Sequence, residues 1–435
     1  MTPSRAKRLE VGLFFVLLAV VAALTVALAQ RPGPVAIAQE GTTPAREVIQ
    51  LPPLPEGDLL LFTSVDTPSL LAAPMPSGEI DEPIPAEQIQ RLIQWGTPAE
   101  EPAPSPAGGE TLLDETVQPD AEEETGHGGG PVVGTLAPSP DGRRVAVQTY
   151  MGLRSVGWVL DLADRQAPML TRFVAEGWGD FLGWHPDSIH ALYRVFDLDV
   201  PDPGLWIVNT NDGTHQRVEI PELAAPEGII AATFSPDGQQ LAYAFTNGLG
   251  FGSELWLSDA TGHERRLVRK DEAAISGGLV WSPDGTQLAF TSLLDSAVPF
   301  SQAGVWIVNA EGADPKILAL MDGGRGQEPV WSPDGQQLFF IARENPGDIT
   351  ADFEADKLIS SVKAVDATNG EISTVVSAES AYQVDLTLTP SGDLLFSSNR
   401  HGSLELWRWS AEGNLRALTA DGEAKRHSLI VSSSQ

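Results

Sequence analysis

The chain has 435 residues, of which 42% are hydrophobic, and it contains 11 Trp, 42 Gly and 34 Pro. This length is enough to bury a large core, and the many Gly and Pro residues favour short strands and tight turns over long helices. The formal net charge of −32 repels nucleic acid phosphates, so we expect no nucleic acid partner. The absence of cysteine excludes disulfides, thiolate metal sites and a Cys nucleophile.

The first thirty residues have the pattern of an export signal. Three basic residues precede an uncharged run of 19 residues from Val11 to Ala29, which ends in an A-x-A cleavage pattern. A helix of this length also just reaches across a bilayer core of roughly 30 Å. The run is therefore either a cleaved signal peptide or a membrane anchor, and the basic residues before it place everything after residue 30 outside the cytoplasm.

Two segments of biased composition follow. Residues 31–53 are rich in Pro and Ala, as in a spacer. Residues 79–130 contain a strongly acidic stretch with prolines and glycines, which we expect to be a mostly disordered insertion. Within it, the apolar spacing between Ala86 and Trp95 predicts one or two helical turns that dock on a neighbour.

From residue 131 onwards the chain repeats a short turn motif. The six copies are Ser139-Pro140-Asp141-Gly142, His185-Pro186-Asp187-Ser188, Ser235-Pro236-Asp237-Gly238, Ser282-Pro283-Asp284-Gly285, Ser332-Pro333-Asp334-Gly335 and Thr389-Pro390-Ser391-Gly392. The prolines lie 46, 50, 47, 50 and 57 residues apart. A period of this length indicates a propeller or a solenoid.

Each repeat contains four short apolar segments. One precedes the turn and a second follows it, a third carries a Trp at a fixed place, and the fourth follows a Gly-containing turn. The fifth repeat departs from this pattern, because Lys363 replaces the Trp. Pro, Asp and Gly have structural roles in a type I turn, so we interpret the motif as structural. We therefore expect an all-β fold, a propeller with four-stranded antiparallel blades.

The motif also resembles a known family. Trp281-Ser282-Pro283-Asp284-Gly285 and Trp331-Ser332-Pro333-Asp334-Gly335 are similar to the signature of TolB-like (PD40, WD40-like) β-propeller repeats, and the strand pattern matches over about residues 131–420. The resemblance implies a propeller of six or seven blades that serves as a protein-binding platform in the bacterial envelope. Residues 131–435 are therefore expected to form the propeller.

Seven blades are favoured over six because the two ends of the chain resemble parts of one further blade. The segment from Leu54 to Ser64 is similar to the turn and second strand from Thr389 to Ser398, and the segment from His427 to Ser433 is similar to a first strand. Residues 54–78, with a third strand from Ser69 to Ala73, and the C-terminal strand would together close the ring.

Known catalytic motifs are absent from the sequence. We find no G-x-S-x-G nucleophile elbow, no phosphate-binding loop and no H-E-x-x-H zinc motif, so we expect no enzymatic activity and no cofactor. His185 and His190 have an approximate metal-ligand spacing, but the repeat assigns them to a turn and a strand. The loop cluster Asp197, Asp199 and Asp202 is either a calcium site or a solvated acidic turn.

The candidate binding residues come from one column of the repeat, five residues before each proline. This column consists of Thr135, Phe181, Ala231, Gly278, Glu328 and Asp385. Glu328 and Asp385 are either a cation or amine site at the mouth of the channel, metal ligands of a lactonase-like enzyme, or carboxylates paired with arginines and backbone amides.

The favoured function is therefore a non-catalytic scaffold of the cell envelope, a monomer that binds another envelope protein or a small ligand. The alternatives are a metal-dependent channel enzyme and an ectodomain sensor that acts with a separate signalling partner.

Overall fold

The computed structural model describes most of the chain after residue 46. The described residues are 47–75, 82–95, 132–151, 154–174, 179–195, 203–220, 228–246, 252–271, 276–293, 302–323, 328–348, 350–377, 380–389 and 391–432. They lie in one compact unit, Thr43–Gln435. None of the helices within these ranges has the length and apolarity needed to cross a membrane, and the apolar run from Val11 to Ala29 lies outside the described residues.

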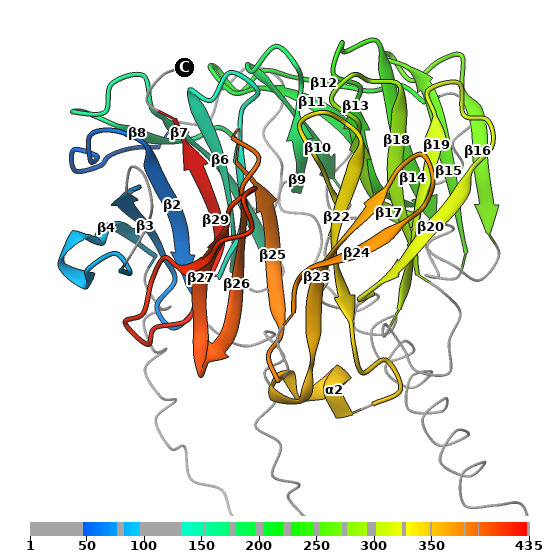
Figure 1. Ribbon diagram of the computed structural model, residues 1–435. Helices are drawn as coiled ribbons and strands as arrows, with labels where there is room; N and C mark the ends of the chain where they lie inside the picture. Colours follow the sequence, from blue (N-terminus) through cyan, green and yellow to red (C-terminus); the bar gives the residue numbers. More distant parts are fainter. Residues whose placement is uncertain are drawn as a thin grey trace, which may run out of the picture. The chain divides into compact units, whose positions relative to one another are not determined.

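The strands form seven antiparallel sheets that stand side by side as the blades of a propeller (Figure 1). The first blade contains β5 (Val132–Pro138), β6 (Arg144–Met151), β7 (Arg154–Asp161) and β8 (Met169–Arg172). The second contains β9 (Asp180–Trp184), β10 (His190–Val195), β11 (Gly204–Asn209) and β12 (His215–Arg217). The third contains β13 (Ile229–Phe234), β14 (Gln240–Thr246), β15 (Ser253–Asp259) and β16 (Arg266–Asp271).

The remaining blades follow the same order. The fourth contains β17 (Ser276–Trp281), β18 (Gln287–Leu293), β19 (Ala303–Asn309) and β20 (Lys316–Met321). The fifth contains β21 (Val330–Trp331), β22 (Gln337–Arg343), β23 (Ser360–Asp366) and β24 (Ile372–Val376), with the short helices α2 (Thr350–Phe353) and η3 (Ala355–Lys357) between β22 and β23. The sixth contains β25 (Gln383–Leu388), β26 (Leu394–His401), β27 (Ser403–Trp409) and β28 (Leu415–Ala417).

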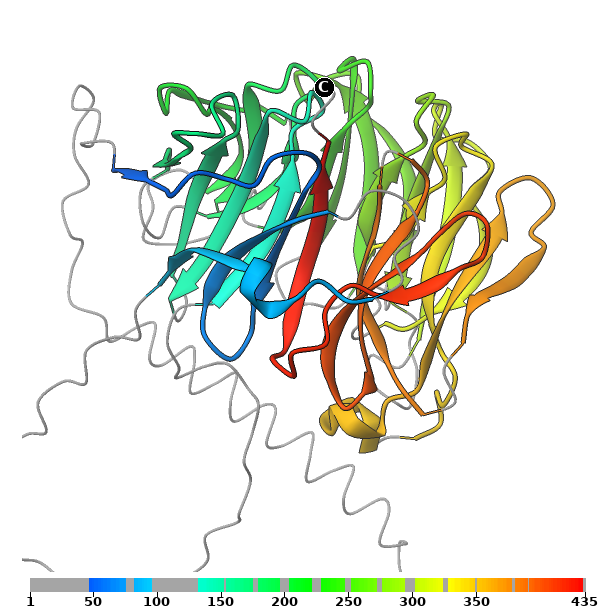
Figure 2. The same cartoon turned by 60° about the vertical axis from the view of Figure 1, so that its left-hand side comes forward.

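The seventh blade is built from both ends of the described chain. Its strands are β29 (Lys425–Val431), β2 (Leu59–Ser64), β3 (Ser69–Pro74) and β4 (Gln90–Gln94), paired in that order. Figures 1 and 2 show the red C-terminal strand directly beside the blue N-terminal strand. The first strands of successive blades contact one another around the whole ring, including β29 with β5, so they surround the channel. The predicted seven-bladed propeller closed by both termini is confirmed.

Two local predictions need correction. The helical turns expected between Ala86 and Trp95 are limited to the 3-10 helix η1 (Ala86–Gln88), and the following residues form β4, the fourth strand of the closing blade. These residues form a strand and not a helix because they pair with the edge of β3. The spacer also contains a strand, since β1 (Val48–Gln50) pairs with β8 as a fifth strand of the first blade.

The repeated turns have the structural role that the sequence predicts. In the blade of β17 and β18, the hydroxyl of Ser282 donates a 2.6 Å hydrogen bond to Asp284 and accepts one of 3.0 Å from the amide of Gln287. The same two contacts recur at Ser139, Ser235 and Ser332. Gly285 adopts φ +70°, which a residue with a side chain rarely adopts. A Cβ atom at Gly285 would lie 3.5 Å from Pro236, so the turns of neighbouring blades pack against each other.

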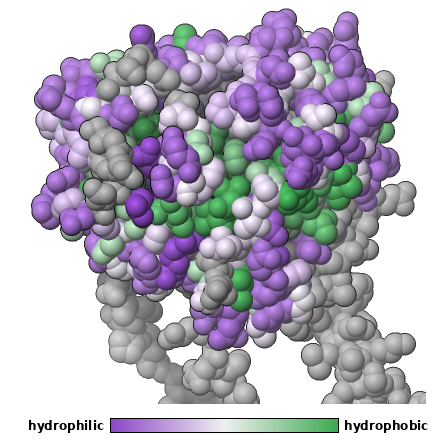
Figure 3. Space-filling view, in the orientation of Figure 1, coloured by the Kyte–Doolittle hydropathy of each residue, from purple (hydrophilic) through white to green (hydrophobic). Residues whose placement is uncertain are grey.

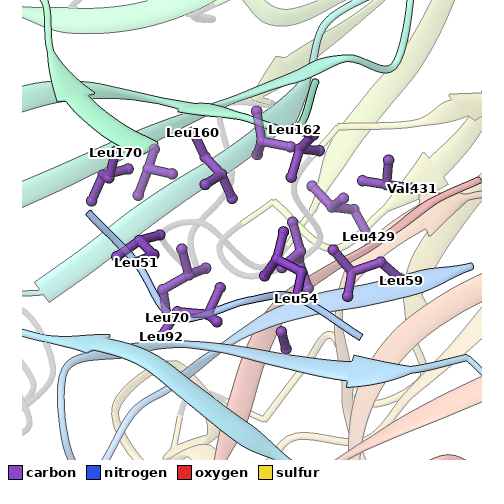
Figure 4. Packing of buried hydrophobic residues seen from close by; sticks show 14 of the residues in the cluster. Leu51, Leu54, Leu59, Leu70, Leu92, Leu160, Leu162, Leu170, Leu429 and Val431 are labelled. Atoms are coloured by element: carbon purple, nitrogen blue, oxygen red, sulfur yellow. The ribbon is translucent and has the colours of Figure 1, made fainter. Parts of the chain in front are cut away.

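The core is divided among the interfaces between blades, and the closing blade shares one apolar cluster with the first blade. Leu59, Leu70 and Leu429 of the closing blade pack with Leu160 and Leu170 of the first blade (Figure 4). Leu51 and Leu54, which follow β1, belong to the same cluster and are buried. Burial of several leucines at this joint stabilises it by roughly 1.5–3 kcal/mol for each side chain.

The outer strands expose apolar side chains. Leu267 on β16, Ile317 and Leu320 on β20 and Ile372 on β24 are each 44–48% exposed. In the orientation in which β20 and β24 face the viewer, hydrophobic surface lies between hydrophilic regions above and below it (Figure 3). The charged Arg269 and Lys270 accompany the apolar residues on β16, and such charges protect a sheet edge from pairing with other strands.

Candidate functional site

A cavity of about 400 Å³ lies where the inner strands of blades two to five begin. The first strands β9, β13 and β17 line it, together with residues from the outer three strands of the fourth blade and with Glu328, two residues before β21. The lining residues are Phe181, Leu182, Ile230, Ala231, Ala232, Gly277, Gly278, Leu279, Thr291, Leu293, Ala303, Met321, Asp322, Gly323 and Glu328. Most of the lining residues are apolar or glycine, but polar atoms contribute about as much of the cavity surface as apolar atoms do.

Gly278 provides the space in which Glu328 lies. It sits at a bulge of β17 and adopts φ +55°, which favours glycine. A Cβ atom at this position would lie 2.9 Å from Oγ1 of Thr291 and 3.4 Å from Cγ of Glu328. The missing side chain thus lets the glutamate and the threonine hydroxyl approach the same point of the cavity wall.

Glu328 has no cationic partner among the residues that the structure describes. Glu328 is exposed to solvent, and the cavity wall beside it removes part of the water from its carboxyl group. This partial removal from water raises the pKa of the carboxyl group above its ordinary value, and no neighbouring charge contributes to the shift. The carboxylate is therefore available to a cation that enters the cavity.

Asp385 has a different environment, in the joint between the sixth and seventh blades. It is 2% exposed, and both of its carboxylate oxygens accept hydrogen bonds from Arg426 of β29, at 2.8 and 2.9 Å. Its Oδ1 also lies 3.5 Å from Nδ1 of His427. Burial acts to raise the pKa of Asp385, but Arg426 and His427 outweigh it and hold the pKa below the ordinary value. Asp385 thus contributes to ring closure.

A second ion pair lies in the same joint. Lys425 of β29 is fully buried, and its Nζ lies 3.5 Å from Glu405 of β27 and pairs with Asp421. The ammonium also donates a 2.9 Å hydrogen bond to the carbonyl oxygen of Glu423. These ion pairs were not predicted from the sequence. The predicted inner strand begins at His427, whereas β29 begins two residues earlier and includes Lys425 and Arg426.

Glu328 and Asp385 occupy the same position of the repeat but have different environments. Glu328 faces a cavity, whereas Asp385 is engaged by Arg426. Sequence reasoning also missed Thr291 and Asp322, which line the same cavity as Glu328. Thr291 lies on β18 and Asp322 directly follows β20, and the first-strand column samples neither position.

The remaining predicted site residues are distributed as follows. His185 and His190 both contact Asp187, whose Oδ2 lies 3.2 and 2.6 Å from the two Nδ1 atoms, and they belong to a turn and to the start of β10. Asp197, Asp199 and Asp202 lie outside the described residues. Within the described ranges, no group of three or more His, Asp or Glu side chains has a geometry that could hold a metal ion.

Lys363 occupies the place that Trp has in the other five repeats. It lies opposite Phe340, as Trp306 lies opposite Phe290 in the fourth blade, and its Nζ is 3.0 Å from Glu344. An ion pair at the surface of the fifth blade therefore replaces the aromatic packing of its neighbours.

Comparison with solved structures shows the fold. The tricorn protease matches over 91% of this chain and 37% of its own, with 12% identity and a TM-score of 0.51. TolB from Acinetobacter baumannii matches over 69% of this chain and 66% of its own, with 16% identity and a TM-score of 0.43. An oligogalacturonate lyase from Vibrio parahaemolyticus matches over 87% and 89%, with 12% identity and a TM-score of 0.48.

The chain is a β-propeller. The seven antiparallel blades confirm the propeller fold expected from the repeated turn motif. The chain spans about two thirds of the Acinetobacter protein and about a third of the tricorn protease, and identities this low concern the fold and not the activity. No protein-family model matches the sequence. No curated protein matches it either.

Proposed function

We propose that this propeller is a non-catalytic binding protein of the cell envelope that recognises its ligand or partner at the cavity beside Glu328. The observation that carries the proposal is the cavity itself, which is concave, has both apolar and polar surface and contains a carboxylate without a cationic partner among the described residues. Binding sites commonly combine apolar side chains with polar groups that orient the ligand.

The hydrogen bonds of the repeated serines support a role other than catalysis. The hydroxyl groups of Ser139, Ser235, Ser282 and Ser332 are buried, donate to the aspartate of their own turn and accept from a backbone amide. A nucleophilic serine instead needs a general base within hydrogen-bonding reach and an open path to a substrate. These four serines therefore stabilise turns.

The amino-terminal sequence supports an extracytoplasmic location. Basic residues followed by the apolar run from Val11 to Ala29 match an export signal or anchor, after which the propeller lies outside the cytoplasm. The net charge of −32 favours neutral or basic ligands and partners over acidic ones.

The test is capture of the ligand or partner from the organism's own cell envelope. Full-length protein, the cavity-filling variant Ala231→Leu and the control Ala411→Leu, at an exposed turn of the sixth blade, are purified in parallel. We expect one species to copurify with the wild type and the control and to be lost from Ala231→Leu, because the larger side chain occupies the cavity. Equal recovery with all three proteins would contradict the proposal.

The same preparations test the two alternatives from the sequence. A lactonase-like enzyme would show metal-dependent hydrolysis of lactones that Ala231→Leu reduces. A sensor ectodomain would copurify with a signalling protein. If the wild type hydrolysed lactones at a rate well above that of Ala231→Leu, the protein would be an enzyme and the non-catalytic proposal would be wrong.

A further inference from the structure

Two polar side chains of the cavity lie close together. Cγ of Glu328 and Oγ1 of Thr291 both lie within 3.4 Å of the position that a Cβ atom of Gly278 would occupy. The remaining wall includes Asp322 and apolar side chains such as Phe181 and Leu279. A ligand that fills the cavity therefore contacts oxygen acceptors together with apolar side chains.

We propose that this cavity binds an organic ammonium ion, a protonated amine carried on an apolar body, with Glu328 and Thr291 accepting its hydrogen bonds. The inference rests on the proposed binding function and names the chemical class of its ligand. A free alkylamine and the lysine side chain of a partner both have this chemistry.

The charge of the ligand follows from the surroundings of Glu328. Among the described residues, no Arg, Lys or His side chain pairs with this exposed carboxylate, so its negative charge is open to a cation. A neutral ligand would remove further water from the carboxylate without replacing it, and an anion would be repelled. An ammonium ion replaces that water with charge-assisted hydrogen bonds.

The wall and the volume of the cavity indicate that the ligand carries an apolar part beside its ammonium group. A cavity of about 400 Å³ lies within the range typical of small-ligand sites, which extends from about 300 to 1,000 Å³. Such a space is much larger than an inorganic cation needs. Calcium would in addition require six to eight oxygen ligands, whereas the apolar residues dominate this wall.

The experiment measures binding of defined probes to the purified full-length protein by isothermal titration calorimetry. Hexylammonium represents a free amine and Nα-acetyl-lysine amide represents a protein side chain, while 1-hexanol and hexanoate are the neutral and anionic counterparts of hexylammonium. We expect one or both of the ammonium probes to bind at least tenfold more tightly than hexanol, and hexanoate not to bind.

Variants then assign the binding to the cavity. Glu328→Gln preserves the shape of the side chain and removes its charge, so it should weaken ammonium binding about tenfold or more and leave hexanol almost unchanged. Glu371→Gln, at an exposed position beside β24, is the matched control and should bind as the wild type does. Thermal unfolding of each variant verifies that it is folded.

Two outcomes would overturn the inference. One is that neither ammonium probe binds more tightly than hexanol, and the other is that Glu328→Gln binds the ammonium probes as tightly as Glu371→Gln does. In either case the proposed function survives if the envelope species is still lost from Ala231→Leu. The proposed function itself is tested by the separate capture experiment. It would be contradicted if the wild type, Ala231→Leu and Ala411→Leu all recovered the envelope species equally.

Discussion

One residue position recurs with a left-handed backbone in the first strands of three blades. Gly278, Asp385 and His427 adopt φ +55°, +58° and +50°, and each lies at a bulge opposite a fully buried phenylalanine of the second strand. The three positions have different consequences. Gly278 leaves space for Glu328, whereas Asp385 and His427 have side chains that meet each other across the closing joint. A shared backbone irregularity therefore borders the cavity in one blade and the closing joint in two others.

Asp385→Asn tests the closing ion pair. The substitution removes the charge that compensates Arg426, so we expect a loss of about 3 kcal/mol in the free energy of unfolding at pH 7. The pKa of Asp385 is lowered from 3.8, which means that its contribution is present above pH 3.8 and is lost as the pH falls through the lowered pKa. The stability of Asp385→Asn should therefore fall less steeply below about pH 4 than that of the wild type.

Chemical denaturation between pH 3 and 8 measures this difference. Asp356→Asn is the control, because Asp356 is 72% exposed and pairs only with a neighbouring lysine. His427 also titrates, because burial lowers its pKa from 6.5 while Asp385 partly raises it, so its stabilisation is lost as the pH falls below 6.5, and more of it is lost in Asp385→Asn. Identical pH profiles of Asp385→Asn and the wild type below pH 4 would show that the pair does not stabilise the ring.

At the scale of elements, the closing blade shows how pairing overrides local propensity. Residues 86–95 have apolar spacing that fits a short helix, yet β4 forms because the edge of β3 is available and its residues can bury Leu92 against the first blade. The 3-10 helix η1 retains part of the helical tendency at the start of the segment. The order of strands in this blade, from β29 to β4, joins residues more than 350 positions apart in the chain.

Deletion of residues 428–435 tests the contribution of β29. The shortened chain loses Leu429 and Val431 from the core cluster and exposes the edge of β2, so we expect the melting temperature to fall by at least about 5 °C and the protein to associate. A deletion of residues 433–435, which lie after β29, is the control. A decrease of no more than a degree or two in the longer deletion would mean that β29 does not hold the ring closed.

At the scale of the whole molecule, noncovalent contacts close the ring, since the chain has no cysteine. On one side of β29 lie the ion pairs of Arg426 and Lys425 with the sixth blade, and on the other side lies the leucine cluster shared with the first blade. The N-terminal segment adds β1 to the outer edge of the first blade, where Glu47 lies 3.5 Å from Arg172. Both ends of the described chain are thus tied into the propeller.

The location of the protein is a prediction for the whole molecule. Cell fractionation should recover it in the membrane or outside the cell, with the propeller accessible to protease added from the outside. N-terminal sequencing then distinguishes an uncleaved anchor from cleavage after Ala29. An uncleaved chain in the cytosol would contradict the predicted export.

The sequence by itself determined the fold class, because turn chemistry and strand alternation are local and recur in six copies. The pairing of the two ends was also visible, since the segment from Leu54 to Ser64 resembles a turn and strand of the sixth blade. Only the tertiary structure decided the roles of Glu328 and Asp385, which occupy the same column of the repeat. Their difference depends on Gly278, Arg426 and the cavity wall, which come from other blades, and side chains that meet only across blade interfaces leave no pattern within a single repeat.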